Sequence, residues 1–180
     1  MNATRSARRR LAAAAAIACL AIGVPTVALA ASSGPHARAS APRCTQSDTY
    51  VWFALSPNGT AGPVFYPVEF TNIGTKACTL TGFPGVSAIS ASLHQIGAAA
   101  SREKAAVHTV TIRPGQTAHA SLGVIDPGFL TGCHKAAADG LKVYPPNEKA
   151  SQDVLSFSFE ACKNKSVLTV FPVTNGIGVP

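Results

Sequence analysis

Ser101 and Lys104 are the residues whose types and spacing come nearest to a catalytic pattern. They match the S-x-x-K spacing, in which a lysine activates a serine nucleophile. The S-D-N and K-T-G elements that accompany this pattern are absent from the sequence, as is G-x-S-x-G, the turn that carries the nucleophile of many hydrolases. We therefore predict that Ser101 to Lys104 is a charged surface loop, and we assign no catalytic residue.

The five histidines are the next candidates for chemistry. His108 and His119 flank a turn with the sequence Arg-Pro-Gly-Gln at residues 113–116, so a hairpin there would place them diagonally on adjacent strands. Such a pair suits copper or zinc, and the alternative is two solvent-facing histidines. No C-x-x-C or H-x-x-x-H spacing occurs, and we expect neither a metal nor another cofactor.

Cysteine usage points to disulfides. Once Cys19 is removed with a leader, Cys44, Cys78, Cys133 and Cys162 remain, and an even count in an exported chain indicates two disulfides. Four cysteines allow three connectivities, among which the sequence does not formally choose. We predict the pairing of sequence neighbours, Cys44 with Cys78 and Cys133 with Cys162.

The first 30 residues have the features of a secretory signal peptide. Basic residues precede an apolar run from Leu11 to about Leu29, and an A-x-A cleavage site ends at Ala30, so that the mature chain would begin at Ala31. The sequence leaves the general and twin-arginine export routes open. We predict a secreted, extracellular protein.

Two membrane-bound alternatives are disfavoured. Gly23 and Pro25 interrupt the apolar run, which argues against a permanent membrane anchor. The leucine preferred three residues before a lipidated cysteine is missing upstream of Cys19, so lipoprotein anchoring is not expected.

The charge of the chain is concentrated in this leader. The whole sequence has a formal charge of +7, but from Ala31 onward eleven basic residues face all eight acidic ones, which leaves +3. These basic residues are scattered singly, whereas binding to phosphates needs clustered Lys and Arg. Nucleic acid is therefore excluded as a partner.

The rest of the chain divides into a linker and one domain. Residues 31–43 (ASSGPHARASAPR) have no apolar periodicity and are predicted to be a flexible tether. Residues 44–180 contain short alternating segments rich in Val, Ile, Thr, Phe and Tyr, each closed by Gly, Pro or Asn. The expected strands are 50–55, 64–71, 77–81, 86–89, 107–112, 117–124, 141–144, 154–159 and 168–173.

Three details of these strands can be tested. Pro67 predicts that residues 64–71 form an edge or bulged strand, because proline cannot donate to the ladder. The turn at 113–116 predicts that 107–112 and 117–124 are antiparallel neighbours. In 154–159 we expect Leu155, Phe157 and Phe159 to point inward.

Eight or nine such strands predict an all-β fold, an antiparallel β-sandwich of immunoglobulin-like type.

Three stretches of the domain resemble a known family. They are 70–86 (FTNIGTKACTLTGFPGV), 110–118 (VTIRPGQTA) and 141–146 (LKVYPP), and they are similar to segments of the domain of unknown function 4232 family of exported actinobacterial proteins. The resemblance covers Cys44 to Val173. It implies an exported sandwich with cysteines near these positions, and many relatives are lipoproteins. It implies no activity.

The remaining candidates are apolar side chains. Phe129 and Leu130 lie in a turn-rich connection and predict an interaction loop, the alternative being that both close one end of the sandwich. Trp52 is expected to pack in the core against a disulfide.

We therefore predict a monomeric, noncatalytic domain that binds a protein or a cell-envelope component. The alternative is a protease inhibitor or hydrolase acting through a loop such as Ser101 to Lys104.

Overall fold

The computed structural model describes residues 40–54 and 62–178. The predicted signal peptide with its cleavage site at Ala30 and Ala31, and most of the tether, lie outside these residues. Pro42, which was expected in the tether, already bonds to the domain, since its carbonyl accepts the Thr79 amide at 2.8 Å.

The described residues form fourteen strands and two short 3-10 helices. In chain order they are η1 (Gln46–Asp48), β1 (Thr49–Phe53), β2 (Val64–Asn72), β3 (Cys78–Thr81), β4 (Gly85–Ile89), β5 (Gln95–Ile96), β6 (Ser101–Arg102), β7 (Thr109–Ile112), β8 (Thr117–Val124), η2 (Pro127–Phe129), β9 (Lys135–Ala138), β10 (Gly140–Tyr144), β11 (Gln152–Val154), β12 (Phe159–Cys162), β13 (Leu168–Val170) and β14 (Thr174–Asn175).

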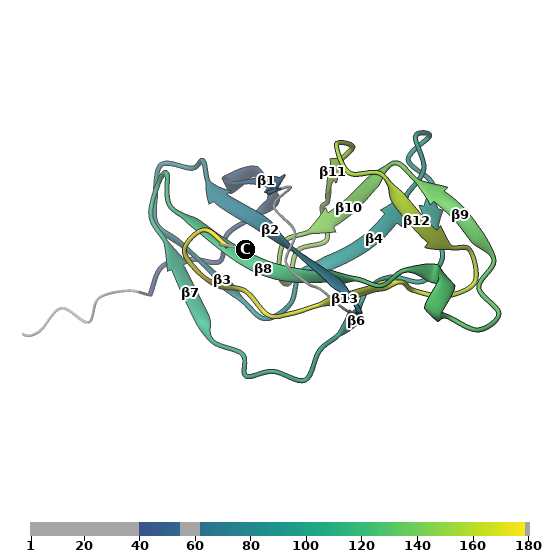
Figure 1. The fold of residues 1–180 in the computed structure, drawn as a ribbon. Coiled ribbons are helices and arrows are strands. Elements are labelled where there is room, and N and C mark those ends of the chain that lie inside the picture. Colours follow the sequence, from purple (N-terminus) through teal and green to yellow (C-terminus); the bar gives the residue numbers. More distant parts are fainter. Residues whose placement is uncertain (1–39, 55–61, 179–180) are drawn as a thin grey trace, which may run out of the picture. The chain divides into compact units, whose positions relative to one another are not determined.

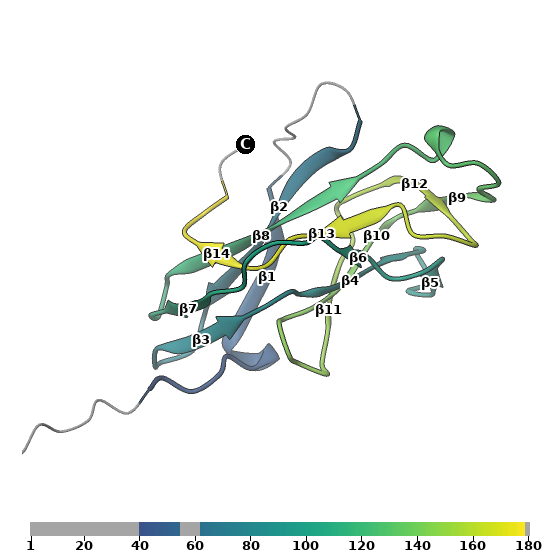
Figure 2. The ribbon, with the colours of Figure 1, turned by 90° about the horizontal axis from the view of Figure 1, so that it is seen from below.

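These strands are arranged in four sheets. The largest has the order β1-β2-β8-β13-β6, with β14 also paired to β8, and a second has the order β11-β10-β4-β5. Two-stranded sheets are formed by β12 with β9 and by β3 with β7. The named pairs are antiparallel except β13 with β6. Figure 1 shows the central β2–β8 pair, and Figure 2 shows it in a layer apart from β3 and β4.

One hydrophobic core joins these sheets. Val68 and Phe70 of β2, Leu122 of β8, and Leu141 and Val143 of β10 belong to the same buried cluster and are each fully buried. Side chains that alternate along strands of two sheets therefore meet between them, as in a sandwich. The predicted all-β, antiparallel class is confirmed.

Both disulfides of the prediction are present. Cys44 bonds to Cys78 and Cys133 to Cys162, across sequence separations of 34 and 29 residues. The first disulfide ends at Cys78, the first residue of β3, and the second at Cys162, the last residue of β12. Cross-links of this length stabilise a fold mainly by restricting the unfolded chain.

The predicted hairpin around Pro114 is wrong. A turn does form, because the Gln116 amide donates to the Arg113 carbonyl at 2.9 Å and Gly115 has a φ of 76°. However, β7 pairs with β3 and β8 pairs with β2, so the turn carries the chain from one sheet to another. His108 and His119 consequently do not lie on paired strands.

Residues 154–159 do not form one strand, which corrects a second expectation. Val154 ends β11, paired with β10, whereas Phe159 begins β12, paired with β9. Between them Leu155 is 53% exposed and Phe157 is buried. The alternation placed the two phenylalanines correctly toward the core, but the backbone leaves one sheet and enters another.

The expectation for Pro67 is also wrong, because β2 is flanked by β1 and β8. The register that pairs Phe53 with Val68 puts Pro67 opposite Ala54, just past the end of β1, and the Ala54 amide donates to the Pro67 carbonyl at 3.4 Å. The missing N–H of Pro67 therefore costs one bond at the end of the β1–β2 ladder, and the β8 side is unaffected.

Asn72, at the end of β2, bonds to the segment that crosses from one sheet to the other. Its side-chain amide donates to the carbonyls of Lys76 and Ile112, both at 2.9 Å, and its side-chain oxygen accepts the Gly74 amide at 2.8 Å. Its backbone bonds to Gly115 and Gln116 in the turn after β7. Asn72 is 1% exposed, so it satisfies buried polar groups from three segments at once.

Replacing Asn72 with Ala is expected to destabilise the domain, because the buried Ile112 carbonyl loses its side-chain donor. We expect a loss of about 2–4 kcal/mol, since each unsatisfied buried group costs roughly 1–3 kcal/mol. Urea unfolding measures it. Asn175→Ala, at an exposed asparagine, is the matched control and should change stability by less than about 0.5 kcal/mol. Equal effects of the two substitutions would contradict this role of Asn72.

Candidate functional site

Four aromatic side chains gather at one end of the domain. The ring centroids of Phe53 and Phe157 are 4.6 Å apart, those of Tyr66 and Phe157 are 4.7 Å apart, and Phe159 lies 5.0 Å from Phe157. The Tyr66 and Phe157 rings meet edge to face, a favourable geometry for aromatic pairs. Phe157 is therefore the centre of an aromatic cluster built from three separate parts of the chain.

Three members of this cluster, Tyr66, Phe157 and Phe159, line a cleft of about 260 Å³. The start of β2, the end of β8, the loop that follows β8, and the start of β12 supply its lining. The lining residues are Val64, Tyr66, Val124, Ile125, Asp126, Pro127, Phe157, Ser158, Phe159 and Glu160. A largely apolar recess with a few polar groups has the character of a ligand-binding site. We call it the aromatic cleft.

The loop after β8 is held in a defined shape beside the cleft. The Asp126 side chain accepts the Gly128 amide at 2.6 Å and caps η2, while its carbonyl accepts the Phe129 amide at 3.0 Å. The Leu130 amide donates to Pro127, and the Cys133 amide donates to Leu130. The Cys133–Cys162 disulfide then ties the loop to β12. The loop therefore presents its side chains from a fixed backbone.

The two side chains predicted for an interaction loop have different environments. Leu130 is partly buried and packs against the hydrophobic core, as the alternative of a closed sandwich end required. Phe129 is 71% exposed, the largest exposure among the exposed large hydrophobic side chains that the structure describes. Exposed aromatic side chains beside a recess are typical of binding surfaces. Phe129, but not Leu130, remains available to a partner.

Charged side chains lie at the rim of the cleft. Lys135 of β9 donates to Glu160 of β12 at 3.0 Å. This hydrogen bond, then the charge of Glu160 and also that of Asp126, raises the pKa of Lys135. Two acidic residues of the cleft lining thus act on one ammonium group.

The Ser101–Lys104 segment is not arranged as a nucleophile and base. Ser101 and Arg102 form β6, and the Ser101 hydroxyl lies 3.0 Å from the Thr169 hydroxyl and 3.3 Å from the Leu168 carbonyl. The Lys104 amide is bonded to Glu103. The Ser101 hydroxyl therefore serves the contact between β6 and β13.

Trp52 does not have the core position expected of it. In β1 the buried residues are Thr49, Val51 and Phe53, so Trp52 faces the opposite side of the sheet and is half-buried. Its indole nitrogen donates to the Thr71 hydroxyl at 2.9 Å. Trp52 therefore bonds to Thr71 on the outer face of the large sheet.

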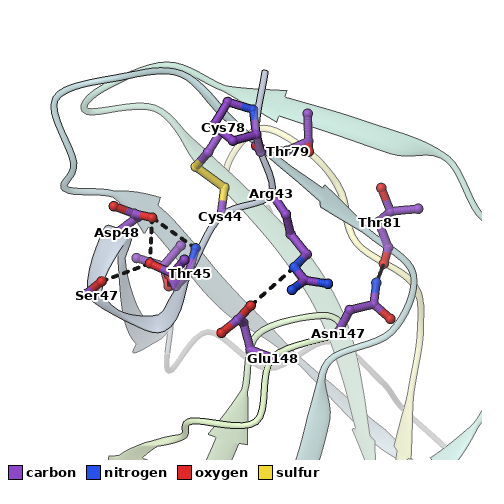
Figure 3. A network of polar contacts seen from close by, with 12 residues as sticks. Arg43, Cys44, Thr45, Ser47, Asp48, Cys78, Thr79, Thr81, Asn147 and Glu148 are labelled. Carbon is purple, nitrogen blue, oxygen red and sulfur yellow. Dashed lines mark hydrogen bonds and ion pairs between the residues drawn. A yellow bond between two sulfur atoms is a disulfide. The ribbon is translucent and has the colours of Figure 1, made fainter. Parts of the chain in front are cut away.

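A polar network surrounds the Cys44–Cys78 disulfide (Figure 3). Arg43 pairs with Glu148 at 3.3 Å, and Asn147 donates to the Thr81 carbonyl at 2.9 Å. These bonds attach the turn after β10 to the start of the domain and to β3. No cleft residue takes part, and the network has the character of a structural brace.

Asp48 in the same region completes a capping box for η1. Its carboxylate accepts the Thr45 hydroxyl at 2.6 Å and the Thr45 amide at 3.0 Å (Figure 3). These two bonds, the hydroxyl first, lower the pKa of Asp48. A charged acceptor at the start of a helix satisfies amides that have no partner within the helix.

One protein family matches the chain. The model described as Domain of unknown function (DUF4232) matches residues 44–174. The chain belongs to this family. The resemblance seen in the sequence is thereby confirmed. No curated protein and no solved structure matches the chain.

Among residues 40–54 and 62–178 no three His, Cys, Asp or Glu side chains are grouped so that they hold a metal ion. In the same ranges no helix is long and apolar enough to cross a membrane.

Glu69 is a buried carboxylate that sequence reasoning missed. It lies on the outer face of β2 yet is fully buried, because the segment after β14 covers it. One carboxylate oxygen accepts the Gly178 amide at 2.8 Å, and the other has no partner among the described residues. Gly178 packs so closely on Pro67 and His119 that a Cβ would come within 2.4 Å of Pro67.

His119 is the titratable group that faces Glu69 within the described residues. The two are opposite each other in the β2–β8 register, and the His119 ring also lies 2.9 Å from the Gly176 carbonyl. Burial raises the pKa of Glu69, while the Gly178 amide and the charge of His119 act in the opposite direction. The net effect is a raised pKa, so the fold favours the protonated carboxyl.

Glu69→Gln is expected to change how stability depends on pH. The raised pKa means that the native protein loses stability as pH rises from the ordinary glutamate pKa through the folded one, because the buried carboxyl must ionise. Glutamine does not ionise, so its advantage over glutamate should grow across this range and then level off. Urea unfolding at a series of pH values measures it. Glu103→Gln, at an exposed position, is the control, and parallel profiles for wild type and Glu69→Gln would contradict the assignment.

Proposed function

We propose that this chain is a secreted, noncatalytic domain that binds a protein through the aromatic cleft and Phe129. The observation that carries the proposal is the 71% exposure of Phe129 on a loop that is fixed by its own hydrogen bonds and a disulfide. A rigid loop loses little conformational entropy on binding, so an exposed aromatic there contributes its full burial to affinity.

Secretion is supported by two independent features. The leader has the three regions of a signal peptide, and both disulfides belong to the kind of bond that persists in oxidising compartments. The mature chain would keep the four paired cysteines and lose Cys19. Its surface would then present no free thiol.

Intact mass spectrometry of the protein recovered from the culture medium of the producing cells tests this part of the proposal. We expect a monomer that begins at Ala31 and is four hydrogens lighter than the fully reduced chain, because two disulfides are formed. Alkylation without a reductant should add nothing. A chain that retains residues 1–30, or one that carries a lipid on Cys19, would refute secretion by cleavage at Ala30.

A photo-crosslinking amino acid at position 129 of the full-length protein tests the binding surface in the producing cells. Matched probes at Ile73 and Ile177, which are 61% and 59% exposed, control for exposed apolar side chains in general. We expect a discrete protein adduct at position 129 and none at the two control positions. An adduct to a cell-envelope polymer instead, or equal labelling at all three positions, would contradict a specific protein partner.

Serine substitutions separate binding from folding at this loop. Phe129→Ser should change stability by less than about 0.5 kcal/mol, since an exposed side chain contributes little to the fold. Leu130→Ser should cost roughly 1–3 kcal/mol, because Leu130 packs against the core. Thermal and urea unfolding measure both. A large loss with Phe129→Ser would mean that Phe129 holds the fold together and is not reserved for a partner.

A further inference from the structure

The charges in the lining of the aromatic cleft are all of one sign. Asp126 and Glu160 are the charged residues of the lining, and no Lys, Arg or His is among the lining residues. Both carboxylates act on the Lys135 ammonium, which is bonded to Glu160 and also attracted by Asp126. The rim of the cleft therefore already holds a cation, although the lysine that provides it belongs to β9 and is not part of the lining.

The apolar walls of the cleft suit the uncharged part of a ligand that carries a cation. Tyr66, Phe157 and Phe159 are among the lining residues, and a cation over an aromatic face is attracted by the electron density of the ring. The methylene stem of a lysine side chain gains from the same apolar walls while its ammonium stays at the polar edge. Aromatic rings and carboxylates together recognise an alkylammonium group better than either does alone.

The size of the cleft limits what it holds. Its 260 Å³ is below the range of about 300–1,000 Å³ that is typical for pockets of drug-sized ligands. One long side chain of a protein partner is a suitable occupant. Phe129, which follows the lining residue Pro127 by two positions, would lie against the surface around that side chain.

We propose that the aromatic cleft binds a lysine side chain of a partner protein, whose ammonium takes the place of Lys135 at Glu160. This inference rests on the proposed function, since it names what the same surface recognises. Lys135 and Glu160 have side chains that are 52% and 59% exposed, and an ion pair of this kind between exposed groups is weak. Replacing Lys135 with an incoming ammonium group therefore costs little free energy.

The experiment is an NMR titration of the mature protein with Nα-acetyl-lysine N-methylamide, a mimic of one lysine residue. The norleucine analogue, which has the same stem without the ammonium, is the matched ligand control. We expect millimolar binding that shifts the amide signals around Ile125 and Phe159, with an at least threefold preference for lysine. Equal binding of the two compounds, or no shift with lysine, overturns the inference.

Variants at the rim give a readout that packing alone would not produce. Lys135→Ala removes the competing ammonium and should strengthen binding of the lysine mimic by about twofold to fivefold, whereas Glu160→Gln should weaken it by a similar factor. Glu103→Gln, at an exposed carboxylate outside the cleft, should have no effect. Glu160 is exposed, so its substitution leaves the fold intact. Weaker binding by Lys135→Ala would contradict the exchange.

Failure of this inference is distinguishable from failure of the proposed function. If the probe at position 129 captures a protein but the cleft does not prefer lysine over norleucine, the binding surface stands and the lysine site is refuted. If the cleft prefers lysine and the probe at position 129 captures no protein, the proposed protein-binding function fails while the recognition of an alkylammonium stands.

Discussion

Asn72 is the residue on which the connection between the sheets depends. It ends β2 in the large sheet, and its side chain reaches the carbonyl of Ile112 at the end of β7 in another sheet. Its backbone also bonds to the turn that starts β8. Because the side chain of a single buried asparagine supplies both donors and an acceptor, the chain can cross between layers without leaving polar groups unpaired. These bonds join the end of β2 to the end of β7 and to the turn before β8.

The β2–β8 pair then supports different features on its two faces and at its end. The inner face carries Val68, Phe70 and Leu122 into the core, and the end of the pair carries the aromatic cleft. The outer face holds Glu69 beneath the segment that follows β14. A buried carboxylate in that position opposes folding at neutral pH. In this domain Glu69 lies beside His119 and Gly178.

Several features of the fold could be predicted from the sequence because their causes are local. Strand 117–124 was predicted at the bounds observed, since it alternates and is closed by turn residues. The disulfide pairing was also correct. Strand partners were less predictable: the turn at 113–116 has hairpin composition, but Asn72, about 40 residues earlier in the sequence, ties it to another sheet. The short strands β5, β6 and β9 have too few alternating residues to give a pattern.

For the candidate site, alternation in the sequence by itself placed Phe157 and Phe159 inward correctly and Leu155 wrongly, since Leu155 is 53% exposed. Phe129 was expected in an interaction loop, whereas Tyr66 was not singled out. Only the tertiary structure decided that the three rings meet in one cleft, that Leu130 is packed while Phe129 is exposed, and that Glu69 is covered. The physical reason is that alternation fixes the face of a strand on which a residue lies, whereas contacts between strands far apart in sequence depend on register and sheet order.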